Sequence, residues 1–202
     1  MLHKKEILKL LLVIVGTAIA ALGLDMAIYA GFGSATLAVL WQGMAEIMPL
    51  TIGQASLIAA VAMVVFCWFY DRSQIQIGTI LYQVIYSFCL DLFAPYLHYS
   101  QAKWVNFILM IVGLVIFSLG SALYSLADFG RGSYEALTFA FVHKNGWSIQ
   151  RVRIVLDIAC VVLGYALGGK FGICTIATIL LSGVLLQKFV HGLKPMTDKI
   201  LG

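Results

Sequence analysis

Charged side chains are scarce in this chain. They make up only 11% of its 202 residues, whereas 62% are hydrophobic. A water-soluble domain of this length needs far more polar side chains to cover its surface. The composition therefore excludes a soluble globular protein, and we expect an all-α integral membrane protein whose main partner is the lipid bilayer. The net charge of +4 requires no nucleic-acid partner, because Lys and Arg at the cytoplasmic ends of membrane spans account for it.

Residue patterns that hold metals, nucleotides or reactive intermediates are also lacking. The four cysteines show no C-x-x-C spacing, and the four histidines form no i,i+4 pair with one another or with glutamate, so we expect no metal site. The chain has no complete G-x-x-x-x-G-K-[ST] phosphate loop and no G-x-S-x-G motif. We therefore expect no catalytic residues, no cofactor and no enzymatic activity. Any energy must come from an ion gradient or a separate ATPase subunit.

Long apolar runs are what the chain does contain. A helix needs roughly 20 residues to cross the hydrocarbon layer of a bilayer. Six runs approach this length and predict six transmembrane helices. They lie near Leu10–Ala30, Gly53–Tyr70, Ile75–Tyr96, Trp104–Ala127, Val152–Gly168 and Phe171–His191.

The first half of the chain is repeated in the second half. Aligning residues 7–93 with residues 104–189, at an offset of 97 positions that falls to 96 after one deletion, brings like residues into register. The matched pairs include Gly16 with Gly113, Gly23 with Gly120, Gly33 with Gly130, and Thr79 with Thr175. Residues 1–100 and 101–202 are therefore predicted to be two three-helix repeats of one membrane domain.

The distribution of Lys and Arg predicts the orientation. Because cytoplasmic loops retain positive charge, the face that holds most cations should be cytoplasmic. With a cytoplasmic N-terminus, 11 of the 13 cations lie inside: Lys4, Lys5, Lys9, Arg72, Arg131, Lys144, Arg151, Arg153, Lys188, Lys194 and Lys199. Both termini are then cytoplasmic. Since three spans is an odd number, the second repeat is inverted relative to the first.

Each repeat carries a short extra helix after its first span. Gly-rich bends at residues 31–33 and 130–132 lead into segments of about three helical turns, too short to cross a membrane. Thr36 and Ser133 occupy matching places where a hydroxyl can cap the helix. The two helix N-termini could face an anionic or carbonyl-bearing ligand. Amphipathic helices lying at the membrane interface are the alternative.

The second repeat places charge inside a span. Arg153 and Asp157 stand at i,i+4 on one helix face, close enough to pair, whereas the matched Ser56 and Ala60 are uncharged. This asymmetry fits a ligand site, and a structural ion pair fits it equally. Asp25 and Asp91 are expected near the hydrated outer interface. The candidate ligand-binding residues are Arg153, Asp157, Glu135, Ser133, Arg131, Gln83, Thr79 and Thr175. For the two threonines the alternative is a hydrogen bond from the hydroxyl to the backbone carbonyl one turn back.

The second half also carries a family resemblance. The residues are Gly130–Leu137, Trp147–Ile149, Val152, Arg153 and Asp157, then Leu167–Gly169, Gly172–Thr175, Ser182 and Gly183. This pattern resembles the YczE/YitT-like family of bacterial multi-pass membrane proteins. Ser133–Glu135 replaces that family's proline-bearing segment, and Cys174 stands where glycine is usual. The resemblance implies a bacterial cytoplasmic membrane and brings little assigned activity.

Three functions follow from these patterns. Inverted three-helix units with short broken helices are a recurring plan of secondary transporters, so a small transporter or substrate-binding permease for a small polar or anionic molecule is our first hypothesis. A substrate-capturing subunit of an ATP-driven importer and a non-transporting accessory or scaffold protein are the alternatives. The sequence does not identify the substrate or the coupling ion, and it leaves a homodimer open.

Overall fold

The computed structural model describes residues 4–98 and 100–201. This part of the chain contains no strand, and eight α-helices and two short 3-10 helices account for most of it. The α-helices are α1 (Lys4–Tyr29), α2 (Thr36–Ile47), α3 (Ile52–Tyr70), α4 (Ile77–Phe93), α5 (Lys103–Leu126), α6 (Ser133–Asn145), α7 (Ile149–Ala166) and α8 (Ile173–Leu201). The 3-10 helices are η1 (Arg72–Gln74) and η2 (Ala94–Tyr96).

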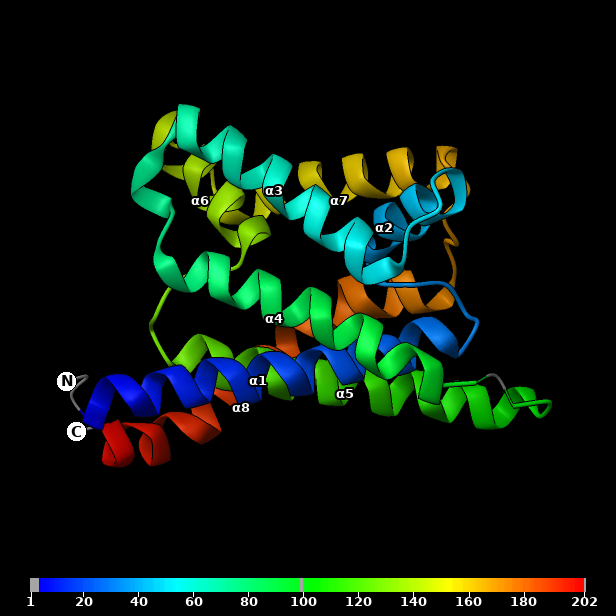
Figure 1. The fold of residues 1–202 in the computed structure, drawn as a ribbon, viewed down its shortest axis with the longest axis horizontal. Helices are drawn as coiled ribbons and strands as arrows, with labels where there is room; N and C mark the ends of the chain where they lie inside the picture. The colour runs from blue at the N-terminus through cyan, green and yellow to red at the C-terminus, as the bar shows by residue number, and fades with distance from the viewer. Residues whose placement is uncertain (1–3, 99, 202) are drawn as a thin grey trace.

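The long helices run roughly along the longest axis of the molecule (Figure 1). Helices α1 and α5 lie along one side, α2, α3, α6 and α7 lie along the other, and α4 and the first half of α8 lie between them. The start of α1 and the end of α8 are at the same end of the molecule (Figure 1). This arrangement is the one expected of helices that cross a bilayer side by side.

Close packing of α1 against α5 depends on four glycines. A Cβ on Gly16 would lie 2.9 Å from the carbonyl oxygen of Gly120, and a Cβ on Gly23 would lie 2.7 Å from that of Gly113. Side chains at these positions would collide with backbone, so only glycine allows the two helices to approach this closely. The contact is reciprocal, because Gly120 is the repeat counterpart of Gly23 and Gly113 is the counterpart of Gly16.

The Gly-rich bends also make matching contacts. Gly33 and Gly130 both have a positive φ, of 92° and 142°, which favours glycine. A Cβ on Gly33 would lie 2.5 Å from the backbone nitrogen of Gly172, just before α8, and a Cβ on Gly130 would lie 2.9 Å from that of Thr79 at the start of α4. Each bend therefore packs against the start of the third long helix of the other repeat.

The short helices cross over between repeats in the same way. Helix α2 packs against α7, where a Cβ on Gly43 would lie 2.4 Å from the carbonyl oxygen of Gly164. Helix α6 packs against α3 through Leu137, Ala140 and Cys67. Because each repeat supplies the partner for the short helix of the other, neither half buries its apolar faces alone.

Five of the six predicted spans are long and apolar enough to cross a membrane: α1, α3, α4 with η2, α5 and α8. The sixth, α7, forms a helix of 18 residues but is not among them. Its 18 residues include three charged ones, Arg151, Arg153 and Asp157, whereas each of the other five contains an apolar stretch of that length with at most two. The six-span expectation is therefore met only in part, and its exception is α7.

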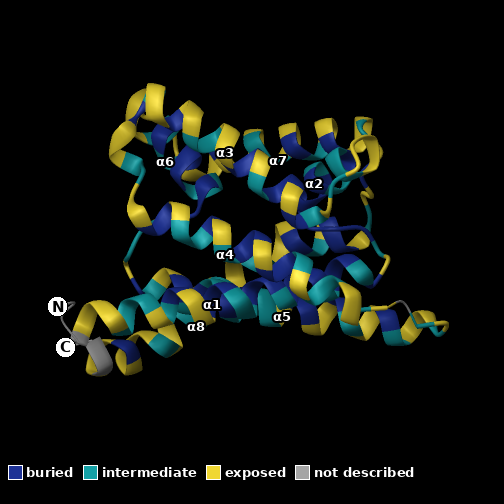
Figure 2. Cartoon of the chain, viewed as in Figure 1, coloured by how far each residue is buried: buried dark blue, intermediate teal, exposed yellow. Residues whose placement is uncertain are grey.

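The outward faces of the helices are apolar. Large hydrophobic side chains such as Phe69, Ile77, Phe88 and Leu180 are exposed, with 81%, 81%, 66% and 65% of their surface accessible. Buried residues face the neighbouring helices (Figure 2). Apolar surface of this extent is normal for a protein whose outer solvent is lipid.

The expectation that Asp25 lies in hydrated surroundings is wrong. Its side chain is fully buried, whereas Asp91 is half-buried and accepts hydrogen bonds from the Thr51 hydroxyl at 2.6 Å and the Gly53 N–H at 2.9 Å. Asp91 thereby ties α4 to the start of α3. No local sequence pattern indicates the burial of Asp25, because its neighbours on α4 come from elsewhere in the chain.

Candidate ligand-binding cavity

A cavity of about 940 Å³ lies between the two sides of the molecule. Its wall includes the first residues of both short helices, Thr36 of α2 and Ser133 of α6. Gln83 of α4 and Asp157 of α7 also line it, as does the first half of α8 from Thr178 onward. The volume falls in the range of small-molecule binding sites.

Asp157 holds the two short helices together at this cavity. Its Oδ1 atom accepts a hydrogen bond from the Thr36 hydroxyl at 2.8 Å and another from the Tyr134 hydroxyl at 2.7 Å. Asp157 lies halfway along α7, so the N-termini of α2 and α6 both come to the middle of that helix. From there α6 runs toward the α3–α4 connection, where Tyr70 bonds Asn145.

This geometry corrects the expected role of the two hydroxyl residues. Neither Thr36 nor Ser133 caps its helix: the N-cap residues are Ala35 and Gly132, and Thr36 and Ser133 are the first helical residues. The Ser133 hydroxyl donates to the Gln83 side-chain oxygen at 3.1 Å. Both helix N-termini are buried in the protein.

The expected ion pair between Arg153 and Asp157 does not form. Asp157 binds the two hydroxyls instead, and the guanidinium of Arg153 lies 5.7 Å from the ring centroid of Tyr134. An acid–base pair does form elsewhere, where His143 Nδ1 lies 2.7 Å from the Asp71 carboxylate. Arg153 therefore remains accessible in the cavity, where its charge acts on Glu135.

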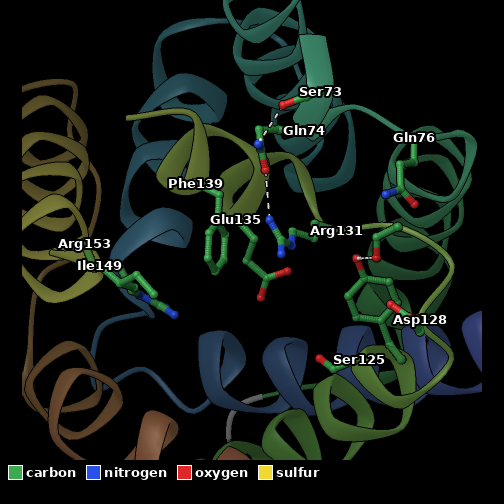
Figure 3. Close-up of a pocket in the computed structure, with 12 residues that line it drawn as sticks. Ser73, Gln74, Gln76, Ser125, Asp128, Arg131, Glu135, Phe139, Ile149 and Arg153 are labelled. Atoms are coloured by element: carbon green, nitrogen blue, oxygen red, sulfur yellow. Dashed lines mark hydrogen bonds between the residues drawn. The ribbon is translucent and has the colours of Figure 1, made fainter. Parts of the chain in front are cut away.

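A second cavity of about 570 Å³ adjoins the first, and Tyr124, Glu135, Ile149 and Arg153 line both. Figure 3 shows the side chains of Glu135 and Arg153 extending into the same space. This second cavity forms a vestibule that leads from the η1 end of the molecule toward the larger cavity.

Arg131 stands in the vestibule and is held from two sides. Its Nη1 atom donates to the Gln74 side-chain oxygen at 2.9 Å, and its guanidinium lies 3.8 Å from the ring centroid of Phe139 (Figure 3). The exposed guanidinium provides a positive charge at the entrance. An anion that enters by this route passes Arg131 before it reaches Arg153.

Gln83 links the cavity to a buried polar network. Its side-chain nitrogen donates to the Ser87 hydroxyl at 3.1 Å and lies 3.4 Å from the Ser56 carbonyl oxygen, and the Ser56 and Ser87 hydroxyls share a bond of 2.7 Å. With Ser133 as donor to its oxygen, the Gln83 amide is fixed in orientation. A ligand would therefore meet a preorganised wall on this side.

The structure brings together six of the eight candidate residues and leaves two apart. Thr79 and Thr175 are fully buried and line neither cavity. Their hydroxyls accept from the backbone N–H groups of Gln76 and Gly172, at 3.3 and 3.2 Å, at the starts of α4 and α8. The two threonines have the same structural role in both repeats, although the bond is not the one to a preceding carbonyl that the sequence suggested.

Several residues of the cavity were not among the candidates. Tyr134, Tyr82, Tyr86 and Trp41 supply aromatic surface and hydroxyl or indole groups to its wall. Tyr134 had a signal in the sequence, since it follows Ser133 at the helix start. Trp41 had no such signal in the sequence. An apolar residue in a short apolar helix gives the same sequence pattern whether its side chain faces lipid or a cavity.

The chemistry of this arrangement suits a small polar or anionic ligand. Unpaired N–H groups and the positive dipole ends of two helices meet at the cavity, and Arg153 adds a formal positive charge. Glu135 and Asp157 supply acceptors. Within residues 4–98 and 100–201, no group of three His, Cys, Asp or Glu side chains is placed to hold a metal ion.

Comparison with known proteins gives the family. Three relatives are 25–29% identical to this chain. The "Uncharacterized membrane protein YczE" of Bacillus subtilis is 29% identical over 138 residues, which cover 68% of this chain and 64% of that protein. An "Uncharacterized protein" of Haemophilus influenzae is 27% identical over 86% of this chain and 79% of its own length. "Uncharacterized protein YyaS" of Bacillus subtilis is 25% identical over 87% of this chain and 89% of its own length.

No solved structure matches the chain. The model of a family of unknown function, DUF6198, matches residues 7–191, which is most of the sequence. The resemblance to YczE-like proteins noted from the second-half motifs is thereby confirmed. The chain is a membrane protein that belongs to the DUF6198 family.

Proposed function

We propose that this protein is a small secondary transporter or substrate-binding permease for a small polar or anionic molecule. It would lie in the cytoplasmic membrane with six spans, arranged as two inverted three-helix units, and with both termini cytoplasmic. The observation that carries the proposal is the 940 Å³ cavity at which the N-termini of α2 and α6 meet Asp157, next to Arg153.

The reciprocal contacts support the inverted arrangement. Each half presents the same surface to the other. Gly16 of α1 contacts Gly120 of α5, and their repeat counterparts Gly113 and Gly23 contact each other in the same way. Each short helix packs on a long helix of the other repeat. Exchange of this kind is what a two-fold relation between two copies produces. In this topology α7 is the fifth of the six spans, and its polar face is accommodated because it lines the cavity instead of facing lipid.

The short broken helices support the transport hypothesis. In transporters built from inverted repeats, half-helices whose N-termini point at the substrate form the site near the middle of the membrane. Here α2 and α6 begin at the middle of α7 and end near opposite ends of the molecule. A ligand bound between their N-termini would contact both repeats, so motion of one repeat against the other could change its access.

A ligand-dependent thermal shift tests the proposal. The purified full-length protein is screened against a panel of small carboxylates, phosphates, amino acids and neutral polar metabolites. A ligand at about 100 times its Kd should add about 2.7 kcal/mol to the stability of the folded state. The Arg153→Gln variant is expected to lose the shift, whereas Arg151→Gln is expected to keep it, because Arg151 lies on the same helix and lines neither cavity.

Two results would contradict the binding site. One is a panel in which no compound shifts the melting temperature of the wild type. The other is a compound that shifts wild type and Arg153→Gln equally. Co-purification of an ATPase with the protein would instead favour the importer-subunit alternative, in which the same cavity captures the substrate.

A further inference from the structure

Asp25 is a buried carboxyl group that the proposed ligand site does not use. It lies in the last two turns of α1, its side chain has no accessible surface, and it lines neither cavity. Neither of its carboxyl oxygens has a hydrogen-bond partner among the described residues. Its repeat counterpart is Ala122, so the group is absent from the other half.

Among the described residues, no cation is found to stabilise a charge on Asp25. The titratable side chains found to interact with it are Tyr86, Cys89 and Asp91, which belong to α4. None of them carries a positive charge. On its own helix, the buried residues Leu24 and Ile28 are apolar and pack in one cluster with Tyr86 and Cys89 of α4.

An ionised carboxylate in this position would be very costly. Burial of an unpaired charge costs far more than the few kcal/mol that a folded protein has in reserve, and such a group takes up a proton instead. The neighbouring carboxyl group of Asp91 adds to this cost, because like charges repel. A neutral carboxylic acid is the form of Asp25 that these surroundings accept.

The position of Asp25 connects it to the cavity wall. The ring of Tyr86, which interacts with Asp25, lies with its centroid 6.0 Å from that of Trp41, and both aromatic side chains line the larger cavity. The Trp41 indole N–H also lacks a partner. A rearrangement of this wall on ligand binding would change the burial of Asp25.

We propose that Asp25 is a proton-binding site of the protein: its carboxyl group holds a proton in the conformation described above and releases it when a rearrangement of the Trp41–Tyr86 wall exposes the group to water. Ionisation breaks the carboxyl O–H bond, leaves the electron pair on oxygen and passes the proton to water. The coupling of this proton to transport rests on the proposed function, whereas the protonation of Asp25 does not.

Infrared spectroscopy of the full-length protein in phosphatidylethanolamine–phosphatidylglycerol vesicles, without added ligand, tests the proposal. A protonated carboxyl group gives a C=O stretching band separate from that of a carboxylate. At neutral pH, the difference spectrum obtained by subtracting the Asp25→Asn spectrum from the wild-type spectrum should contain one protonated-carboxyl band. The spectrum of wild type minus Asp91→Asn should contain none, which makes Asp91 the matched control on the neighbouring helix.

Isotope labelling keeps the test valid if Asp25→Asn fails to fold. Carboxyl-¹³C aspartate incorporated into wild type should shift a protonated-carboxyl band, and strongly alkaline pH should remove that band. The proposal is overturned by a wild-type spectrum with no aspartic acid band at neutral pH, by a band that survives in Asp25→Asn, or by a band that is unchanged at all pH values. Because no substrate is present, these outcomes are independent of whether the ligand screen succeeds.

Discussion

The bond between Asp157 and the two short helices gives a quantitative prediction. Tyr134→Phe removes one donor to Asp157 and leaves the ring, whereas Asp157→Ala removes both bonds and leaves two hydroxyls without an acceptor. Hydrogen bonds between membrane helices contribute about 0.6 kcal/mol on average and at most about 1.7 kcal/mol. A bond to a charged acceptor should lie near the upper end, so we expect Tyr134→Phe to lower the free energy of unfolding by about 1–1.7 kcal/mol.

We then expect Asp157→Ala to lower the free energy of unfolding by about 2–3.5 kcal/mol, which is twice the value for a single bond. Asp157→Asn keeps an oxygen that can accept both hydrogen bonds. It should lower the free energy of unfolding only by the part that depends on the acceptor's charge, about 1 kcal/mol. Reversible unfolding of the purified protein in mixed micelles measures these values. Tyr165→Phe is the control, since Tyr165 is an exposed tyrosine on the same helix.

A double-mutant cycle decides whether the contact is real. If the Tyr134 hydroxyl bonds Asp157, the double variant Tyr134→Phe/Asp157→Ala should be less destabilised than the sum of the two single variants, by about 1 kcal/mol. Strict additivity, or an equal loss in Tyr165→Phe, would refute the arrangement of α2, α6 and α7 around Asp157.

The remaining predictions concern packing and pH. Gly23→Ala should lower the free energy of unfolding by about 1–3 kcal/mol or more, because its Cβ would collide with the backbone nitrogen of Phe117 on α5. Gly183→Ala is the control: its Cβ would meet open space, so the same unfolding assay should show no loss of stability. The pKa of Asp71 is lowered from 3.8 to about 2, first because the Ser73 hydroxyl donates to its carboxylate and also because His143 does. The stability that this carboxylate contributes is therefore present above about pH 4 and lost as the pH falls toward 2. Asp71→Asn should flatten the acid limb of a plot of melting temperature against pH, and an unchanged acid limb would show that Asp71 is not responsible.

Much of the fold follows from the sequence because the repeat register constrains it. The matched glycines Gly16, Gly23, Gly113 and Gly120 predict a close helix contact, and the structure forms it between α1 and α5. The apolar runs predict where long helices lie, within a few residues at most boundaries. The exceptions are α1, which begins at Lys4 instead of near Leu10, and α8, which continues to Leu201, well beyond the expected end near His191.

The candidate cavity was predicted less well, because its contacts join distant segments. Spacing of i,i+4 suggested that Arg153 would pair with Asp157, yet Asp157 bonds Thr36, 121 positions away in the sequence. A local pattern identifies which residues share a helix face, but it contains no information on what that face meets. The same limit applies to Asp25, whose neighbours Tyr86, Cys89 and Asp91 come from α4.

The central claim is that two three-helix units lie inverted in the membrane with a cavity between them. Single cysteines at Lys5, Lys144 and Lys170, in a background that lacks the four native cysteines, test it by labelling with an impermeant maleimide in intact cells and in inverted vesicles. The account predicts that positions 5 and 144 react only from the cytoplasmic side and position 170 only from the other. Labelling of positions 5 and 144 from different sides would contradict it.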